Sequence, residues 1–118
     1  MTVSLTLPYP PSANRIWRSV GGRNIKSAEY RQWLEAGHRA IAAQKPQRID
    51  GAYRLSLVVN RPDNRRRDLS NVVKPLEDLL QAAGVIRDDA DCIRLMVCWG
   101  SLPPAKDAPV FAYLRRAA

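Results

Sequence analysis

The chain has 118 residues, of which 46% are hydrophobic and 25% are charged, a balance typical of one globular domain and not of a disordered protein. Nineteen Lys and Arg against eleven Asp and Glu give a formal net charge of +8, which favours an anionic partner such as nucleic acid. No apolar run is long enough to span a bilayer, so we expect no membrane partner. The amino terminus lacks the pattern of a signal peptide, which predicts a cytoplasmic protein.

The first half of the chain predicts two strands and one helix. Residues 3–7 alternate apolar and polar side chains, as a half-buried strand does, and Pro10 and Pro11 follow it. Residues 12–26 are rich in Ser, Asn, Gly and Arg and predict a long loop. Ser27 is a suitable N-cap for a helix, and residues 53–59 alternate again as a second strand. The apolar stripe of the helix consists of Tyr30, Trp33, Leu34, Gly37 and Ile41.

The second half adds a helix and two strands. A charged loop at 61–68 precedes a helix with an apolar stripe over 69–83, which Gly84 ends. Pro75 leaves the start of this helix open, either near Ser70 or only at Pro75. An acidic loop at 87–91 leads to a strand in which Ile93, Leu95, Val97 and Trp99 share one face. A last strand covers roughly 110–114.

The order β-α-β-α-β-β predicts a single α+β domain over residues 1–118. We expect a small mixed sheet of about four strands with two helices packed on one face. A domain this small can gain stability by pairing with a copy of itself. Cys92 and Cys98 lie six residues apart in one predicted strand, so they cannot bridge each other, and no His is near to complete a zinc site. His38, inside the first helix, is expected on the surface.

The segment 65–91 gathers the residue types that chemistry on phosphodiesters requires. At helical spacing, Asn71, Lys74 and Asp78 share the face opposite the apolar stripe. Carboxylates bind Mg²⁺ or Mn²⁺, a bound metal activates water, and Lys and Arg stabilise phosphate charge. Plainer interpretations exist, because Asp68 can cap the helix and Lys74 and Asp78 can form an ordinary surface pair. Likewise, the arginine run and the acidic loop can be solvated surface. Composition and spacing alone predict a basic nucleic-acid-binding domain, with a nuclease as one alternative.

Three segments together resemble the RusA family of Holliday-junction resolvases. They are PYPPSANRIWR, GGRNIKSAEYRQW and RRRDLSNVVKPLEDLLQAAGVIRDDADCI, and they follow one another over nearly the whole chain. The resemblance implies a homodimeric endonuclease that depends on Mg²⁺ or Mn²⁺. It implies that the enzyme binds four-way DNA junctions and resolves them by paired symmetric nicks during recombination and repair. It also implies a phage or prophage origin.

The resemblance assigns roles to individual residues. Asp68 and Asp89 are the expected catalytic carboxylates and metal ligands, and Lys74 is the expected catalytic lysine. Asp88 is an accessory ligand, and Ser70 and Asp78 complete the expected metal set. The expected DNA contacts are Asn14, Arg15, Arg18, Arg23, Arg65, Arg66, Arg67 and Asn71.

One departure from the family pattern concerns the metal. The family often has D-x-D where this chain has Asp68, Leu69 and Ser70, so the site loses one carboxylate unless Asp78 or Asp91 replaces it. This keeps open the alternative that the protein binds junctions without cutting them, and a further alternative is an RNA-directed nuclease or RNA-binding factor. A competition experiment between a four-way DNA junction and structured RNA distinguishes the RNA alternative from the two DNA alternatives.

The position of the two expected catalytic carboxylates raises a question of geometry. A helix over 69–83 is about 22 Å long, which places Asp68 and Asp89 at opposite ends. Either the helix is shorter or oblique, or Asp89 of one subunit completes the site around Asp68 of the other, as a two-fold dimer permits. Trp17, near Arg15 and Arg18, is either a wedge at the junction centre or a residue that packs in the core or in a dimer.

Overall fold

The main sheet consists of four strands, and buried side chains alternate with more exposed ones in three of them, β1, β4 and β6. The strands are β1 (Thr2–Pro8), β4 (Tyr53–Val59), β5 (Cys92–Trp99) and β6 (Pro109–Arg116), in the spatial order β1-β6-β4-β5. In this computed structural model, which describes residues 1–12 and 15–117, β6 pairs antiparallel with both β1 and β4. β4 and β5 pair in parallel, so their connection must cross over the sheet. The predicted mixed sheet of about four strands is confirmed.

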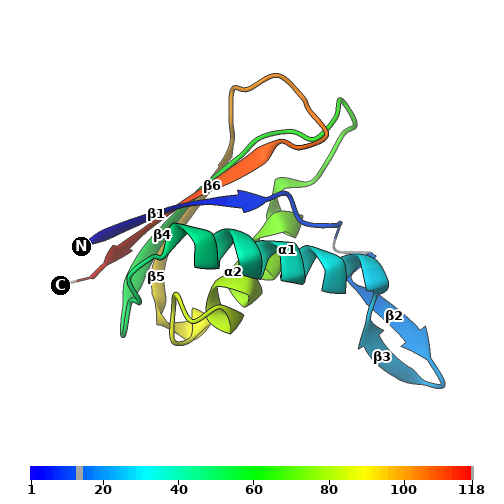
Figure 1. The fold of residues 1–118 in the computed structure, drawn as a ribbon. Coiled ribbons are helices and arrows are strands. Elements are labelled where there is room, and N and C mark those ends of the chain that lie inside the picture. Colours follow the sequence, from blue (N-terminus) through cyan, green and yellow to red (C-terminus); the bar gives the residue numbers. More distant parts are fainter. Residues whose placement is uncertain (13–14, 118) are drawn as a thin grey trace.

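Two helices lie on the same side of this sheet, as predicted (Figure 1). The first, α1 (Ala28–Gln44), begins where the Ser27 side chain accepts a hydrogen bond from the backbone N–H of Tyr30 at 3.1 Å. The second, α2 (Val73–Ala82), forms the crossover between β4 and β5. Gly37 is buried on α1 facing α2, and a Cβ there would meet Leu79 Cδ2 at 2.5 Å. Glycine therefore allows the two helices to approach each other closely.

The start of the second helix combines the two alternatives left open by the sequence. A 3₁₀ turn, η2 (Leu69–Val72), precedes the α-helix, which begins at Val73 and carries Pro75 as its third residue. Proline is tolerated there because its missing N–H would have no partner in the first turn. The helix ends before Gly84, which has a positive φ of 76°.

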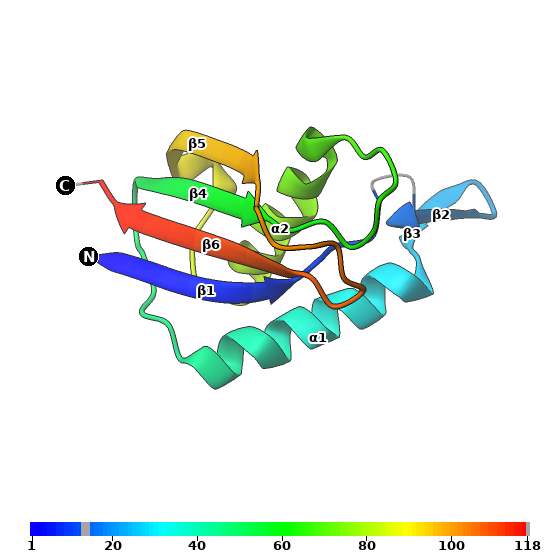
Figure 2. The ribbon, with the colours of Figure 1, turned by 90° about the horizontal axis from the view of Figure 1, so that it is seen from above.

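The apolar stripes meet the inner face of the sheet and form one core. Its fully buried members include Leu55, Leu57 and Leu114 from the strands and Leu76 and Leu80 from α2. The other face of the sheet carries no helix, and Figure 2 views the molecule from that side, with α2 behind the strands. His38 is exposed, and Cys92 and Cys98 are free cysteines, as expected.

The expected loop at 12–26 is wrong in part, because it contains a hairpin. β2 (Trp17–Val20) and β3 (Arg23–Lys26) pair antiparallel around Gly21 and Gly22, which have φ values of 58° and 76°. Glycine adopts two consecutive positive φ values without steric cost, which is what a tight hairpin turn requires. All eight strand residues are exposed, and the hairpin projects from the rest of the molecule (Figure 1). Because the hairpin buries neither face, its sequence shows no alternation of apolar and polar residues, and a strand was not predicted there.

The expected shared face of β5 is also wrong at one position. The pairing of β4 with β5 shifts register after Tyr53, so Cys92 lies opposite Tyr53 while Arg94 lies opposite Arg54. The extra residue, Ile93, is left unpaired and 58% exposed. Leu95, Val97 and Trp99 keep the register of the inner face, and of these only Val97 and Trp99 pack against the core, because Leu95 is 43% exposed. No helix in the described parts of the chain is both long and apolar enough to cross a membrane.

Candidate functional site

Lys74 joins two carboxylates that are distant in sequence. Its Nζ lies 3.0 Å from Asp78 Oδ1, one turn further along α2, and 3.0 Å from Asp89 Oδ2. α2 has ten residues and is about 15 Å long, shorter than the sequence predicted. The chain then folds back, so that Asp89 reaches the amino-terminal half of the helix. The structure thus brings together three of the expected site residues in one chain.

The electrostatics of this group are mutually reinforcing. Hydrogen bonds to Asp78 and Asp89 raise the pKa of Lys74 above its ordinary value. The Lys74 ammonium in turn lowers the pKa of Asp89. Lys74 is therefore a cation at neutral pH and cannot act as a general base there. The plainer interpretation, an ordinary surface pair between Lys74 and Asp78, accounts for only one of its two partners.

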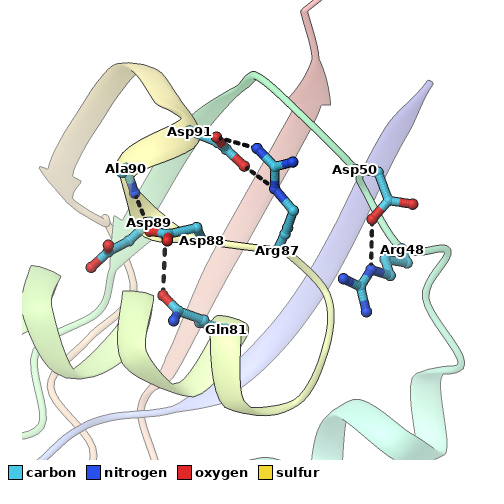
Figure 3. Close-up of polar contacts among 8 residues, drawn as sticks. All are labelled: Arg48, Asp50, Gln81, Arg87, Asp88, Asp89, Ala90 and Asp91. Atoms are coloured by element: carbon cyan, nitrogen blue, oxygen red, sulfur yellow. Dashed lines mark hydrogen bonds and ion pairs between the residues drawn. The ribbon is translucent and has the colours of Figure 1, made fainter.

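A short 3₁₀ turn, η3 (Asp89–Asp91), is held in place by polar contacts from both sides (Figure 3). The Gln81 side chain on α2 accepts a hydrogen bond from the Asp89 backbone N–H at 3.1 Å. The Asp88 carboxylate caps the turn by accepting from the Ala90 N–H at 2.8 Å. Asp91 pairs with Arg87 at 3.0 Å. Asp88 and Asp91 thus have structural partners, whereas the Asp89 carboxylate contacts Lys74.

Asp68 does not cap the helix that follows it, so the plainer interpretation is wrong for this residue. Its side chain makes no capping bond to the backbone of η2. Instead, one carboxylate oxygen accepts a hydrogen bond from Ser70 Oγ at 3.2 Å. Asp68 is exposed and lines a narrow groove of about 150 Å³ with Arg66, Arg67 and Asn71. The carboxylate is therefore presented toward the surface that a ligand can reach.

The donors fit a hard divalent cation, which prefers oxygen ligands. Asp68 and Ser70 converge at one place, and Asp78 and Asp89 converge at another, where the Lys74 ammonium already lies between two carboxylates. Within residues 1–12 and 15–117, no three His, Cys, Asp or Glu side chains come together to hold a metal. Mg²⁺ often binds through only one or two carboxylates and completes its shell with water and substrate phosphate. The residues present are compatible with that mode of binding.

A larger and strongly basic groove of about 670 Å³ adjoins the narrow one. The two share Tyr9, Pro10, Pro11, Ser12, Arg66 and Arg67. The larger groove adds cationic side chains from three separate loops, namely Arg15, Arg65 and Lys106. Five of the expected DNA contacts therefore line one continuous channel that leads to Asp68, namely Arg15, Arg65, Arg66 and Arg67, with Asn71 in its narrow part.

Arg67 has a different role from its neighbours. Its guanidinium pairs with Asp63 at 2.7 Å and lies over the Tyr9 ring, 5.7 Å from the centroid. The hydrogen bond from Arg67 lowers the pKa of Asp63 to about 2. Asp63 also accepts a hydrogen bond from the backbone N–H of Arg65. Asp63 therefore fixes the loop that presents the arginines.

Two further expected DNA contacts, Arg18 and Arg23, lie on the hairpin. Arg18 and Arg23 are exposed on β2 and β3, while Asn14 lies outside the described residues. Trp17 is 52% exposed and meets the Tyr30 ring edge-on, with centroids 6.3 Å apart. Trp17 is therefore not a core residue of this chain, because half of its surface faces solvent, whereas a wedge at the junction and packing in a dimer are both compatible with that exposure.

The sequence reasoning missed several residues that shape the site. Asp63 carried no sequence signal, because it and Arg67 lie in a loop, where the i,i+4 spacing of helix pairs does not predict contact. Gln81 carried no signal, because its contact depends on how the chain returns after α2. Glu77 follows Lys74 by three residues on α2, and burial raises its pKa, with the Asp89 carboxylate adding to the effect. It adds a further carboxyl group beside Lys74 and its partners Asp78 and Asp89.

Comparisons with known proteins all point to one family. A family model described as endodeoxyribonuclease RusA matches residues 8–106. The crossover junction endodeoxyribonuclease RusA of Escherichia coli K12 is 38% identical over 93 residues, 78% of each chain. The enzyme of the same name from enterobacteria phage HK97 is 36% identical over 84 residues, 70% of each chain. That of enterobacteria phage 82 is 36% identical over 96 residues, 78% of each chain.

Proposed function

The chain belongs to the RusA family of endodeoxyribonucleases, and we propose that it cuts Holliday junctions and related branched DNA by metal-dependent phosphodiester hydrolysis. The relatives are named crossover junction endodeoxyribonucleases and come from both enterobacteria and their phages. This supports a role in recombination and repair, a prophage origin, and action in the cytoplasm, where bacterial DNA lies. Resolution requires two nicks placed symmetrically across the junction.

The observation that carries the proposal is the position of Asp68 at the end of the basic channel. Arg66 and Arg67 line both grooves, and Asp68 lines the narrow one. A DNA strand held by its phosphates along Arg15, Arg65 and Arg66 would pass directly beside this carboxylate. Asp63 in the same loop is held by Arg67 and by the Arg65 N–H. Among the described residues, the Asp68 carboxylate has a polar contact only with the Ser70 hydroxyl, so it is available to hold a cation beside the phosphate.

The side chains of this site have distinct roles in the proposed reaction. Asp68, with Ser70 beside it, and Asp89, with Asp78 beside it, would hold Mg²⁺ or Mn²⁺, and Asp88 is a weaker candidate because it caps η3. The metal, when bound, lowers the pKa of water and stabilises the charge on phosphate oxygens. Lys74 holds Asp78 and Asp89 in place and supplies a permanent positive charge for the phosphate. Asn71 lines the narrow groove, where it would contact the strand.

A homodimer is part of the proposal because paired nicks require two equivalent sites. A two-fold axis relates the two sites in the same way that it relates opposite strands of a four-way junction. Within the described chain fewer than three carboxylates converge, so a partner subunit could supply the missing ligand. A site shared between subunits is therefore the alternative to a site within one chain, and it is tested by mixing subunits that carry Asp68→Asn with subunits that carry Asp89→Asn. Recovery of cleavage in the mixture would support it.

The proposal is tested by cleavage of a synthetic four-way junction, with a linear duplex of the same sequence as control. We expect nicks in the junction with Mg²⁺ or Mn²⁺ and none with a chelator. Tight junction binding without cutting in either metal would favour the non-catalytic alternative that Ser70 suggests. Stronger competition by structured RNA than by the junction would favour an RNA-directed protein. Wild-type protein that neither binds nor cuts a junction would contradict both the cleaving and the non-catalytic DNA-binding hypotheses.

A further inference from the structure

The open face of the main sheet carries a row of three arginines. The strand registers place Arg115 of β6 opposite Arg54 of β4, and Arg54 opposite Arg94 of β5. All three residues are exposed, and neighbouring strands lie about 4.8 Å apart. Thr2 of β1 completes the row across the whole sheet. Three cations therefore stand side by side on adjacent strands.

No carboxylate balances this row. None of the positions that face outward on the four strands is Asp or Glu, and the next row holds Ser4, Tyr113, Ser56 and Met96. None of the three arginines forms an ion pair within residues 1–12 and 15–117. Like charges directly opposite on paired strands are destabilising. This arrangement therefore does not stabilise the folded protein on its own, and a bound polyanion would offset the repulsion between the arginines.

The row is separate from the basic channel. Both helices cover the opposite face of the sheet, so nothing in the described chain shields the arginines (Figure 2). The loop that carries Arg65 and Arg66 follows the far end of β4, and Arg54 lies about 17 Å from that end at about 3.3 Å per residue. One DNA molecule can therefore contact both surfaces at different points along its length.

We propose that Arg54, Arg94 and Arg115 bind the phosphate backbone of a duplex arm of the DNA substrate. The inference rests on the proposed function and adds to it a second contact surface. Phosphates are the favoured occupants because the row is purely cationic, and the hydroxyls of the next row can donate hydrogen bonds to them. A second copy of the chain is disfavoured, since it would bring two uncompensated arginine rows together on this face.

The test compares two triple variants of equal net charge. Arg54→Gln, Arg94→Gln and Arg115→Gln remove the row, while Arg31→Gln, Arg39→Gln and Arg48→Gln remove three exposed arginines on and after α1. Binding to a long-armed junction is measured with a chelator present, as a function of salt concentration. Each phosphate contact contributes about 0.9 to the slope of log affinity against log salt. We expect the row variant to lose up to about 3 from the slope and the control variant to keep the wild-type slope.

Three results would overturn the inference. They are an unchanged slope in the row variant, an equal loss in both variants, and a loss confined to RNA or to anionic vesicles offered in place of DNA. Circular dichroism establishes that the variants are folded, which we expect because each substitution relieves repulsion. If the wild type does not bind the junction at all, the proposed function fails. If the wild type binds and cuts while the row variant behaves as wild type, only the second surface is wrong.

Discussion

Replacing Lys74 by Met should reduce both cleavage and stability, and cleavage somewhat more. Because the Lys74 ammonium lies 3.0 Å from an oxygen of each carboxylate, those Asp78 and Asp89 oxygens are at most about 6 Å apart. Two unit charges at that distance repel by about 0.7 kcal/mol in water and about 3 kcal/mol at an effective dielectric constant of 20. The two ion pairs themselves contribute about 0.2 to 1 kcal/mol each, since Lys74 is 67% exposed. The variant should lose about 1 to 3 kcal/mol of unfolding free energy.

The effect on the reaction follows from the missing cation. Loss of one positive group beside the developing phosphate charge should reduce the cleavage rate about 100- to 1000-fold. Urea denaturation measures the stability, and single-turnover junction cleavage measures the rate. Arg48→Met is the matched control, because it breaks an exposed pair with Asp50 that lies outside the site, and it should cleave as wild type. Wild-type cleavage by the folded Lys74→Met protein would refute the role assigned to Lys74.

Three further predictions concern charge, metal and packing. Because the pKa of Asp63 is lowered to about 2 from an ordinary value near 3.9, its stabilising contribution is complete above pH 4 and is lost as the pH falls toward 2. Asp63→Asn should therefore flatten the acid limb of a stability profile measured by thermal denaturation, and an unchanged limb would contradict the assignment. Ser70→Asp adds a carboxylate beside Asp68, because the Ser70 hydroxyl now lies 3.2 Å from an Asp68 carboxylate oxygen. The Mg²⁺ concentration for half-maximal cleavage should therefore fall. A rise would count against a metal at Asp68. Gly37→Ala places a Cβ 2.5 Å from Leu79 Cδ2, and its unfolding free energy in urea should drop by about 1 to 2 kcal/mol because overpacking outweighs the gain in helix propensity; a more stable variant would show that Leu79 can move aside.

Features decided by local chemistry could be predicted from the sequence. Ser27 caps α1 as expected, and Gly84 ends the second helical region with a positive φ. The alternation in residues 53–59 became a strand whose inward side chains are buried. In each case the signal lies within a few neighbouring residues, so no tertiary contact is needed to interpret it.

The remaining features depend on contacts between distant residues. The hairpin of β2 and β3 was missed because it buries neither face and so leaves no alternating pattern. The shift that exposes Ile93 arises from pairing with β4, and it cannot be found in the alternation of β5 alone. The contact of Lys74 with Asp89 depends on how the chain returns after α2. For the same reason, the sequence placed Asp68 and Asp89 at opposite ends of a helix that was too long.

The most direct test of the account is cleavage of a four-way junction labelled in turn on each strand, comparing the wild type with Asp68→Asn in Mg²⁺. The account predicts that the wild type nicks two opposite strands at symmetric positions. It also predicts that Asp68→Asn binds the junction with wild-type affinity in a chelator but does not cut it. Undiminished cutting by Asp68→Asn, or wild-type binding that never leads to nicks, would contradict the claim that this channel is the active site of a resolvase.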